Sequence, residues 1–323
     1  MKGSIHIIVQ NERIKYEFEL QRNLTIIRGD SATGKTTLID MIREYKSLGE
    51  DSGVELFCEK ECVVIDGNGW EKQLSDVAQS IVFVDEGNRF VSSVEFARYI
   101  QGTDNYYVLV TRESLSTLPY SVEEIYGIRS SGKYGGLKPL YHEMYQLNTD
   151  RVDTREIVPE KIITEDSNAG YQFFDYICNE AGIECVSAAG KSNVCLELLK
   201  CQDEHVLVIA DGAAFGSEIE KVLKAIGRQK HVALYLPESF EWLILMSDAL
   251  NDREIRTMSE KWGDYIESGR FFSWERFFTE LLMERSKDTY LKYNKNNLNR
   301  AYLNEVVKRK ILRQVKWWKQ EQN

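Results

Sequence analysis

The stretch LTIIRGDSATGKTTLIDMI, residues 24–42, joins an apolar run, a glycine-containing loop and an amphipathic run. Its loop, residues 29–36, fits the pattern G-x-x-x-x-G-K-[ST] in full. Between a strand and a helix this pattern binds phosphate, because backbone N–H groups and the helix N-terminus point at the anion. The stretch therefore predicts a strand, a phosphate-binding loop and a helix, the opening of an α/β domain.

Each part of this loop has an expected task on a nucleotide. Lys35 would place its ammonium group on the β- and γ-phosphates during catalysis, and Thr36 would offer its hydroxyl to Mg²⁺. The sequence thus predicts ATP and Mg²⁺ as cofactors, and the absence of a guanine-reading N-K-x-D stretch favours ATP over GTP. The expected nucleotide-binding residues are Gly29, Asp30, Ser31, Ala32, Thr33, Gly34, Lys35, Thr36 and Thr37.

A second apolar run, SIVFVDE at residues 80–86, ends in two acids. Four consecutive apolar residues suit a strand that is buried on both faces of a parallel sheet. We expect Asp85 to hold the Mg²⁺ shell and Glu86 to orient or deprotonate the attacking water. An acid in this position favours hydrolysis over phosphate transfer to a metabolite, because a kinase must exclude water.

A third apolar run, YYVLVTRE at residues 106–113, ends in polar residues that could sense the γ-phosphate from a neighbouring strand. The possible sensors are Thr111 and Arg112. Three arginines are candidates for stabilising the transition state, and an ordinary surface position is the alternative for each: Arg89, Arg112 and Arg129.

Together, GDSATGKT, VFVDE and VLVTRE resemble the ATPase domains of the AAA/ABC-like P-loop class, over about the first 140 residues. The opening strands SIHIIVQ and IKYEFEL are similar to the antiparallel strands that begin ABC-type domains. The chain departs from that pattern because no LSGGQ-like signature precedes the second acidic strand. LSDVAQ, residues 74–79, lies too close to that strand and lacks the glycines, so a signature-mediated dimer is not implied.

The second half of the chain repeats the alternation of strands and helices. Residues 146–165 are charged, lack a clear apolar face and are expected to form a linker. Beyond them, IECVSA, VLVIAD and HVALYLP are expected strands with helices between them, which predicts a second parallel sheet. GKSN at residues 190–193 is not a second phosphate loop, because the required first glycine is replaced by Cys185.

VLVIADGAAFG, residues 206–216, delivers Asp211 to a turn of small residues. The order of elements from residue 166 to about 250 is similar to a Toprim fold. A P-loop ATPase followed by such a domain resembles OLD-family nucleases and related antiphage-defence ATPases. The resemblance implies a Glu and an Asp in a V-E-G-x-x-D motif on the first strand and a D-x-D on a later strand, which gather Mg²⁺ for phosphodiester chemistry.

Only one of these four acids carries over to this chain. With AAGKSN in the place of the first motif, the Glu and Asp positions are Ala189 and Asn193, and the second Asp of D-x-D falls on Ala213. Two-metal catalysis needs clustered carboxylates, so the resemblance implies a degenerate nuclease centre with Asp211 as a possible second acidic site. A generic flavodoxin-like unit is the alternative. Two further acids could contribute: Glu184 and Glu218.

Charge is distributed unevenly along the chain. The net charge is −10, and residues 287–323 contain ten Lys or Arg and three acids, so this tail carries +7 and the rest −17. Aromatic residues lie among the cations, a pattern typical of nucleic-acid contact. An amphipathic helix docked on the acidic body, or on a partner, is the alternative. Its apolar stripe would comprise Leu303, Val306, Val307, Ile311, Leu312 and Val315.

The predicted organisation is an ATPase domain at 1–145, a linker at 146–165, a Toprim-like α/β domain at 166–270 and a basic helical tail at 271–323. The chain has no apolar run of about 18 residues, a polar N-terminal stretch and six scattered cysteines, which predicts a cytoplasmic protein without membrane contact. We expect an ATP hydrolase, as a homo-oligomer or with a partner protein, in nucleic-acid surveillance or antiphage defence. The alternatives are a nucleotide-gated scaffold and a small-molecule or nucleoside kinase.

Overall fold

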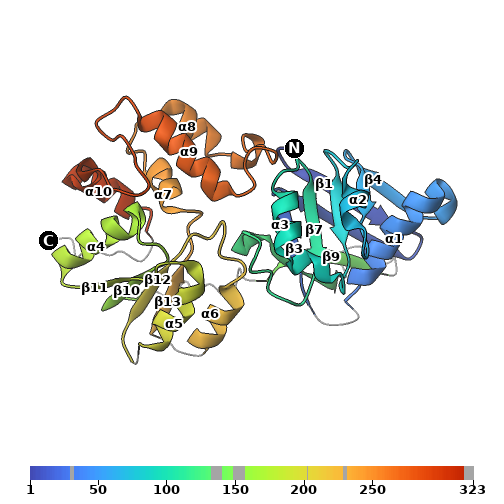
Figure 1. Ribbon diagram of the computed structural model, residues 1–323, viewed down its shortest axis with the longest axis horizontal. Coiled ribbons are helices and arrows are strands. Elements are labelled where there is room, and N and C mark those ends of the chain that lie inside the picture. Colours follow the sequence, from blue (N-terminus) through green and yellow to red (C-terminus); the bar gives the residue numbers. More distant parts are fainter. Residues whose placement is uncertain (30–32, 132–139, 148–156, 202, 228–230, 316–323) are drawn as a thin grey trace. The chain divides into compact units, whose positions relative to one another are not determined.

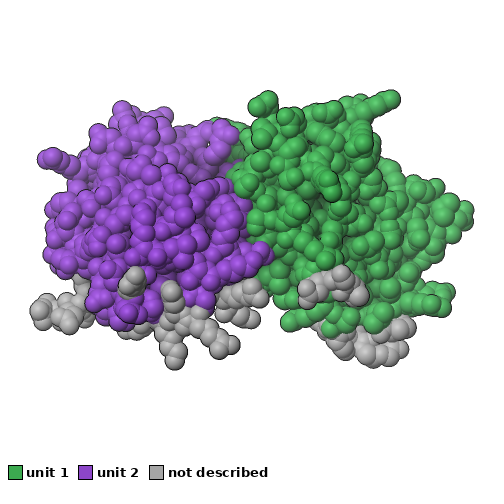
Figure 2. All heavy atoms as spheres, turned by 60° about the horizontal axis from the view of Figure 1, so that its bottom comes forward, with its two compact units in different colours: residues 1–148, 262–272 green, residues 149–261, 273–323 purple. Residues whose placement is uncertain are grey.

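The protein has a mixed α/β fold with two sheets (Figure 1). The computed structural model describes residues 1–29, 33–131, 140–147, 157–201, 203–227 and 231–315. The chain divides into two compact units, coloured separately in Figure 2. Unit 1 comprises Met1–Asn148 and Trp262–Phe272, and unit 2 comprises Thr149–Lys261 and Ser273–Asn323. Within the described ranges, no helix has the length and apolar character needed to span a bilayer.

Unit 1 is built on a large mixed sheet with the order β4-β1-β2-β9-β8-β3-β7-β6-β5. Adjacent strands are parallel from β8 through β3, β7 and β6 to β5, whereas β8 pairs antiparallel with β9, and β1 pairs antiparallel with β2 and β4. The strands are β1 Ile5–Gln10, β2 Ile14–Leu20, β3 Leu24–Ile27, β4 Glu55–Cys58, β5 Cys62–Val64, β6 Ile81–Val84, β7 Tyr106–Val110, β8 Ile125–Ser131 and β9 Leu140–Gln146. The helices are α1 Lys35–Leu48, α2 Trp70–Leu74 and α3 Val94–Ile100, with 3-10 turns at Gly49–Ser52, Arg89–Ser92, Val122–Glu124 and Trp262–Asp264.

The three apolar runs of the sequence form adjacent central strands of this sheet. Every residue of β3, β6 and β7 is buried, as expected for strands covered on both faces. The parallel pairing brings the carboxyl ends of all three strands to the same edge of the sheet. The residues that follow these strands are therefore close neighbours.

A short segment from the second half of the chain completes unit 1. The backbone N–H of Gly3 donates to the carbonyl of Gly263 over 2.8 Å, and the side-chain amide of Asn23 donates to the carbonyl of Ser268 over 3.1 Å. Phe271 and Phe272 are buried in the same segment. Unit 1 is therefore discontinuous in sequence.

Unit 2 contains a smaller, fully parallel sheet with the order β11-β10-β12-β13. Helices α5 and α6 pack against one another, and α7 packs against α4, α9 and α10, as Figure 1 shows. The strands are β10 Lys161–Thr164, β11 Glu184–Ser187, β12 Val206–Ile209 and β13 Val232–Tyr235. The helices are α4 Ala169–Ala181, α5 Val194–Leu199, α6 Ile219–Ile226, α7 Phe240–Met246, α8 Arg253–Met258, α9 Trp274–Ser286 and α10 Glu305–Leu312, with 3-10 turns at Lys191–Asn193 and Arg300–Leu303.

Strand β10 corrects the prediction of a linker over residues 146–165. The strand has four residues, KIIT, and lies between β11 and β12 in the centre of the sheet. Its two apolar residues, Ile162 and Ile163, are fully buried. They lie between charged residues in the sequence, so the apolar run was too short to indicate a strand. The first strand of the second sheet is therefore β10, whereas the sequence placed it at the later strand β11.

The basic tail, as far as it is described, packs onto unit 2 as an amphipathic helix. Val307, Ile311 and Leu312 of α10 are buried, although Val306, assigned to the same stripe, is 66% exposed. Lys308 is 5% exposed, and its ammonium lies 2.6 Å from the carboxylate of Glu180. These contacts favour the docked-helix alternative over the nucleic-acid interpretation. Trp317 and Trp318 lie outside the described residues.

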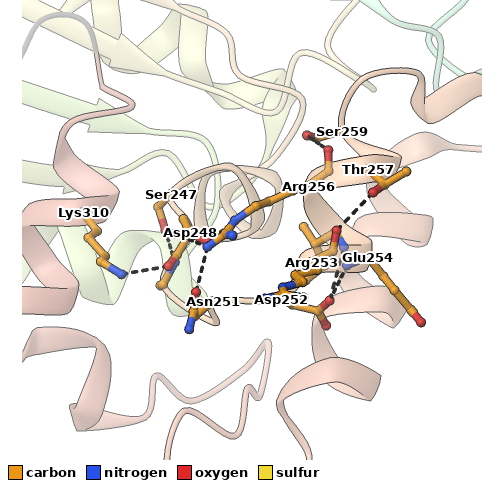
Figure 3. A network of polar contacts seen from close by, with 12 residues as sticks. Ser247, Asp248, Asn251, Asp252, Arg253, Glu254, Arg256, Thr257, Ser259 and Lys310 are labelled. Atoms are coloured by element: carbon orange, nitrogen blue, oxygen red, sulfur yellow. Dashed lines mark hydrogen bonds and ion pairs between the residues drawn. The ribbon is translucent and has the colours of Figure 1, made fainter.

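Lys310 joins α10 to a polar network around the turn before α8 (Figure 3). Its ammonium donates to the backbone carbonyl of Asp248 over 2.9 Å, and Arg256 binds the carboxylate of the same residue. Asp252 caps α8 by accepting hydrogen bonds from the N–H groups of Glu254 and Ile255. The network ties the tail to the body of unit 2.

Candidate functional site

The loop between β3 and α1 requires glycine at both ends of its motif. Gly29 and Gly34 have φ angles of +137° and +91°, which side-chain-bearing residues rarely adopt. A Cβ atom on Gly34 would lie 2.8 Å from the hydroxyl of Tyr16 and 3.2 Å from Cε1 of His142. The Tyr16 hydroxyl also donates to the Gly34 carbonyl over 2.8 Å. The side chains of Tyr16 and His142 therefore contact the backbone turn that leads into α1 and hold it in place.

Tyr16 and His142, which sequence reasoning missed, form this support. Their rings stack with centroids 4.7 Å apart and planes 12° apart. The His142 side chain is 8% exposed, and its Nδ1 atom has no hydrogen-bond partner. Burial lowers the pKa of His142. The two residues are paired across β2 and β9, far apart in sequence, so nothing in the local sequence pattern pointed to them.

Lys35 is buried beneath the loop, with 5% of the residue exposed. Its ammonium donates to the Gly29 carbonyl over 2.8 Å and to the Thr33 hydroxyl over 3.1 Å. Both acceptors are neutral, so an anionic phosphate can replace them. Asp30, Ser31 and Ala32 lie outside the described residues.

The N-terminus of α1 is available to an anion. Its first turn contains no acidic side chain, so no carboxylate of the helix itself lies at the positive end of the helix dipole. Thr36 and Thr37 are exposed in this first turn. The N–H groups at the start of a helix, with hydroxyl groups beside them, are suited to bind an anion.

The acidic strand end lies two strands from the loop. Strand β7 is placed between β3 and β6, and the Thr111 N–H that follows β7 donates to the Ile27 carbonyl of β3 over 3.1 Å. Two inter-strand spacings correspond to roughly 10 Å. This separation leaves room for phosphate, metal and water between the loop and Asp85.

Asp85 is half-buried at the end of β6. Burial, together with the negative charges of Asp40 and Asp66, raises the pKa of Asp85. A cation beside Asp85 would relieve this repulsion. Within the described part of the chain, no three His, Cys, Asp or Glu side chains are placed to hold a metal ion. Mg²⁺ on a nucleotide needs only one or two protein ligands beside the phosphates, so Thr36 and Asp85 fit that requirement.

Glu86 forms an ion pair with Arg112. The carboxylate Oε1 atom lies 2.5 Å from the Nε atom of Arg112, and both side chains reach solvent. Thr111, in contrast, is buried and accepts a hydrogen bond from the Glu113 N–H through its hydroxyl over 3.0 Å. Arg112 therefore lies beside Glu86, the expected catalytic base. The sequence pattern did not indicate this ion pair.

The remaining arginine candidates have different surroundings. Arg129 on β8 lies over the ring of Tyr145, with its guanidinium carbon 4.8 Å from the ring centroid. A guanidinium nitrogen of Arg129 lies 3.6 Å from the carboxylate of Glu143. Arg89 is exposed in a 3-10 turn. Neither observation assigns a role at the loop.

A second group of acids gathers at the carboxyl ends of β10 and β12 in unit 2. The Asp211 N–H donates to Oε2 of Glu165 over 3.0 Å, and Asp166 follows Glu165 directly. Asp166, Glu165 and Asp211 line a small cavity of about 20 Å³. Burial raises the pKa of Glu165 to about 7 and, with the charges of Glu275 and Glu165, raises the pKa of Asp211 well above its ordinary value.

This arrangement corrects the expected partners of Asp211. Glu165, at the end of the first strand, is its neighbour, whereas Ala189 and Asn193 follow the second strand, β11. Glu184 begins β11 and pairs with Lys161 at 3.0 Å, at the opposite end of the sheet. Glu218 is buried and binds Lys221 at 3.0 Å. A correct placement of β10 in the sequence would have identified Glu165.

Comparison with protein-family models gives no match to this chain, and comparison with curated proteins gives none either.

Proposed function

We propose that unit 1 binds and hydrolyses ATP as a member of the AAA/ABC-like P-loop class. The observation that carries the proposal is the loop itself, where Lys35 lies buried beneath a turn that only glycine can form at Gly34. A helix N-terminus whose first turn has no acidic side chain continues this loop. Each feature favours a multiply charged anion over a neutral ligand.

In this proposal, nucleotide binding replaces the internal contacts of Lys35. The ammonium leaves the Gly29 carbonyl and the Thr33 hydroxyl and binds the β- and γ-phosphate oxygens. Contacts with anionic phosphate oxygens replace hydrogen bonds to two neutral acceptors, which favours the exchange. Thr36 and Asp85 are the residues that would hold Mg²⁺, which neutralises phosphate charge when bound.

Hydrolysis requires a water in line with the γ-phosphate and a base to orient it. Glu86 reaches solvent at the end of β6 and is the residue proposed for this task. Water attacks the γ-phosphorus, the bond to the β-γ bridging oxygen breaks, and Glu86 accepts the proton that the water loses. Arg112 holds Glu86 before nucleotide binds, so the release of this ion pair belongs to the catalytic cycle.

A role in nucleic-acid surveillance or antiphage defence, as an oligomer or with a partner, rests on the resemblance of the whole arrangement to OLD-family proteins. The kinase alternative is less favoured because Glu86 is open to water. The nucleotide-gated scaffold differs from the proposal only in turnover. A measurement of turnover therefore separates the three candidates.

The test is release of inorganic phosphate from ATP by the full chain, with and without DNA or RNA. We expect Lys35→Ala and Glu86→Gln to lower turnover by at least about 100-fold, since each removes a group that acts on the transition state. Glu44→Gln, an exposed position on α1, is the matched control and should keep full activity.

Two outcomes would overturn the proposal. Transfer of phosphate to an added nucleoside or metabolite, with little release into water, would identify a kinase. Tight ATP binding that is lost in Lys35→Ala, without measurable turnover, would identify a nucleotide-gated scaffold.

A further inference from the structure

Five acids lie near one another in unit 2, and we call them the acidic centre; one of them, Glu241, is buried and the other four are partly exposed. They come from the ends of β10 and β12 and from the first turns of α7 and α9: Glu165, Asp166, Asp211, Glu241 and Glu275. Their charges act on one another, since Glu275, Glu165, Glu241 and Asp166 all raise the pKa of Asp211. Negative charge that is gathered in one place and partly removed from water requires neutralisation.

One source of neutralisation is Lys295, which follows α9. Its ammonium lies 2.5 Å from Oε1 of Glu275. Burial lowers the pKa of Lys295, but the carboxylates of Glu275, Glu241 and Asp211 outweigh burial and raise it overall. The ammonium therefore acts on three members of the acidic centre.

The backbone holds Lys295 in this position. Its carbonyl accepts a hydrogen bond of 2.8 Å from the Ala169 N–H at the start of α4. The next residues continue the contact, because Gln172 donates to the Asn296 carbonyl over 3.0 Å and accepts from the Leu298 N–H over 2.9 Å. Lys295 is thus fixed at its backbone and at its ammonium group.

A second ammonium and a phenol complete the arrangement. Lys191 donates to the Ala214 carbonyl over 3.2 Å and interacts electrostatically with Glu165 and Glu275. The Tyr293 hydroxyl donates to Oε1 of Glu241 over 2.9 Å, and Glu241 is 2% exposed. Tyr293 thus satisfies one carboxylate of the acidic centre directly, and Lys191 places a positive charge near two others.

The Toprim resemblance implies Mg²⁺ at this place, but the residues present do not fit it. Mg²⁺ requires near-octahedral oxygen ligands at about 2.0–2.1 Å. No three acidic, His or Cys side chains of the described residues converge in that way, and the second Asp of D-x-D is Ala213. Two ammonium groups carry the same charge as one divalent cation.

We propose that Lys295, assisted by Lys191, takes the place of a metal ion in the acidic centre. The centre of the native protein then binds no divalent or trivalent cation, and unit 2 performs no metal-dependent phosphodiester cleavage. The carboxylates instead fasten the segment after α9 to the ends of β10 and β12. Removal of the Lys295 ammonium leaves an uncompensated acidic centre that accepts an external cation.

Terbium luminescence tests this proposal, because Trp274 adjoins Glu275 in the first turn of α9 and can sensitise a bound Tb³⁺ ion. The titration uses the full chain carrying Asp85→Asn, without nucleotide, so that unit 1 contributes as little as possible. We expect no saturable emission from this protein. Lys295→Met should gain saturable emission, at least about 10-fold above the parent, and Lys295→Met combined with Asp211→Asn should lose it. Lys287→Met, an exposed position just after α9, is the matched control and should behave as the parent.

Saturable emission from the parent that disappears with Asp211→Asn would overturn the proposal, because it would reveal a native metal site. The absence of any gain in a folded Lys295→Met protein would also overturn it. If Lys295→Met does not fold, Lys191→Met serves as the second variant, and a gain of emission there supports the proposal. Phosphate release by unit 1 is measured separately, so this test and the ATPase test fail independently.

Discussion

Each unit places a lysine at the carboxyl ends of parallel strands, and the two lysines differ in burial and in their partners, since Lys35 is buried and Lys295 is partly exposed. Lys35 in unit 1 donates to a carbonyl and a hydroxyl, which are neutral. Lys295 in unit 2 donates to the carboxylate of Glu275. A phosphate competes easily with neutral acceptors but poorly with a carboxylate that is already in place. The same residue type therefore favours ligand exchange in one unit and a fixed structure in the other.

The largest expected effect comes from adding a side chain at Gly34 of the phosphate-binding loop. Gly34→Ala introduces a Cβ 2.8 Å from the Tyr16 hydroxyl at a φ angle of +91°. We expect ATP affinity to fall by at least about 100-fold, because the loop must shift away from its anion-binding shape. Isothermal titration with ATP measures this loss. Gly53→Ala, which has a φ of +69° but open space around it, is the control and should bind ATP normally.

The two lysines should differ in their effect on folding. Lys295→Ala leaves Glu275 without its cation, and we expect unit 2 to lose about 1–3 kcal/mol of stability, a range reduced for the partial exposure of the pair. Lys35→Ala should leave the stability of unit 1 within about 1 kcal/mol of the parent, because the acceptors described for it, the Gly29 carbonyl and the Thr33 hydroxyl, are neutral. Urea denaturation compares the variants. Equal losses in both would remove the distinction between an exchangeable and a structural lysine.

The stability contributed by the acidic centre should depend on pH, whereas that of the phosphate-binding loop should not. Burial raises the pKa of Glu165 from 4.5 to about 7, so the folded state holds this proton more tightly than the unfolded state. The resulting stability is complete below about pH 4.5 and is lost as the pH rises through about 7. We expect Glu165→Gln to raise the stability of unit 2 at pH 8, relative to the parent, by roughly 1–3 kcal/mol and to have little effect at pH 5. Urea denaturation at the two pH values measures this difference, and an equal effect at both would contradict it.

The smallest expected effect concerns the ion pair between Arg112 and Glu86. Arg112→Ala frees the carboxylate, so we expect basal phosphate release to rise by about 2- to 5-fold, with little change in the KM for ATP. Steady-state kinetics at saturating ATP measure the change. A fall in kcat would instead assign Arg112 to the γ-phosphate, as the sequence pattern suggests, and would show that this contact also exchanges for a ligand.

The sequence predicted those features that lie in one continuous segment. The strands β3, β6 and β7 are contiguous apolar runs, and the residues that follow them, such as Asp85 and Thr111, could be placed at one sheet edge. Strand β10 escaped notice because four residues between charged neighbours give too short a signal. Missing β10 also displaced the search for acidic partners from Glu165 to Ala189.

Contacts between distant segments could not be predicted in this way. The Tyr16–His142 support depends on the pairing of β2 with β9, and the Lys295–Glu275 pair depends on a turn after α9. Each of these residues belongs to an ordinary local pattern, a strand or a polar loop. Their proximity follows only from the three-dimensional fold. The excess positive charge of the tail did not indicate that Lys295 would pair with Glu275.

The discontinuity of unit 1 has a consequence for inheritance. The chain passes from one unit to the other three times, after residues 148, 261 and 272. A gene fragment that ends at residue 148 encodes a sheet without the segment that supplies Ser268, Phe271 and Phe272. A recombination event that exchanges unit 2 for another domain must therefore preserve eleven residues from the middle of the exchanged region. This requirement favours the two units being inherited and modified as a pair.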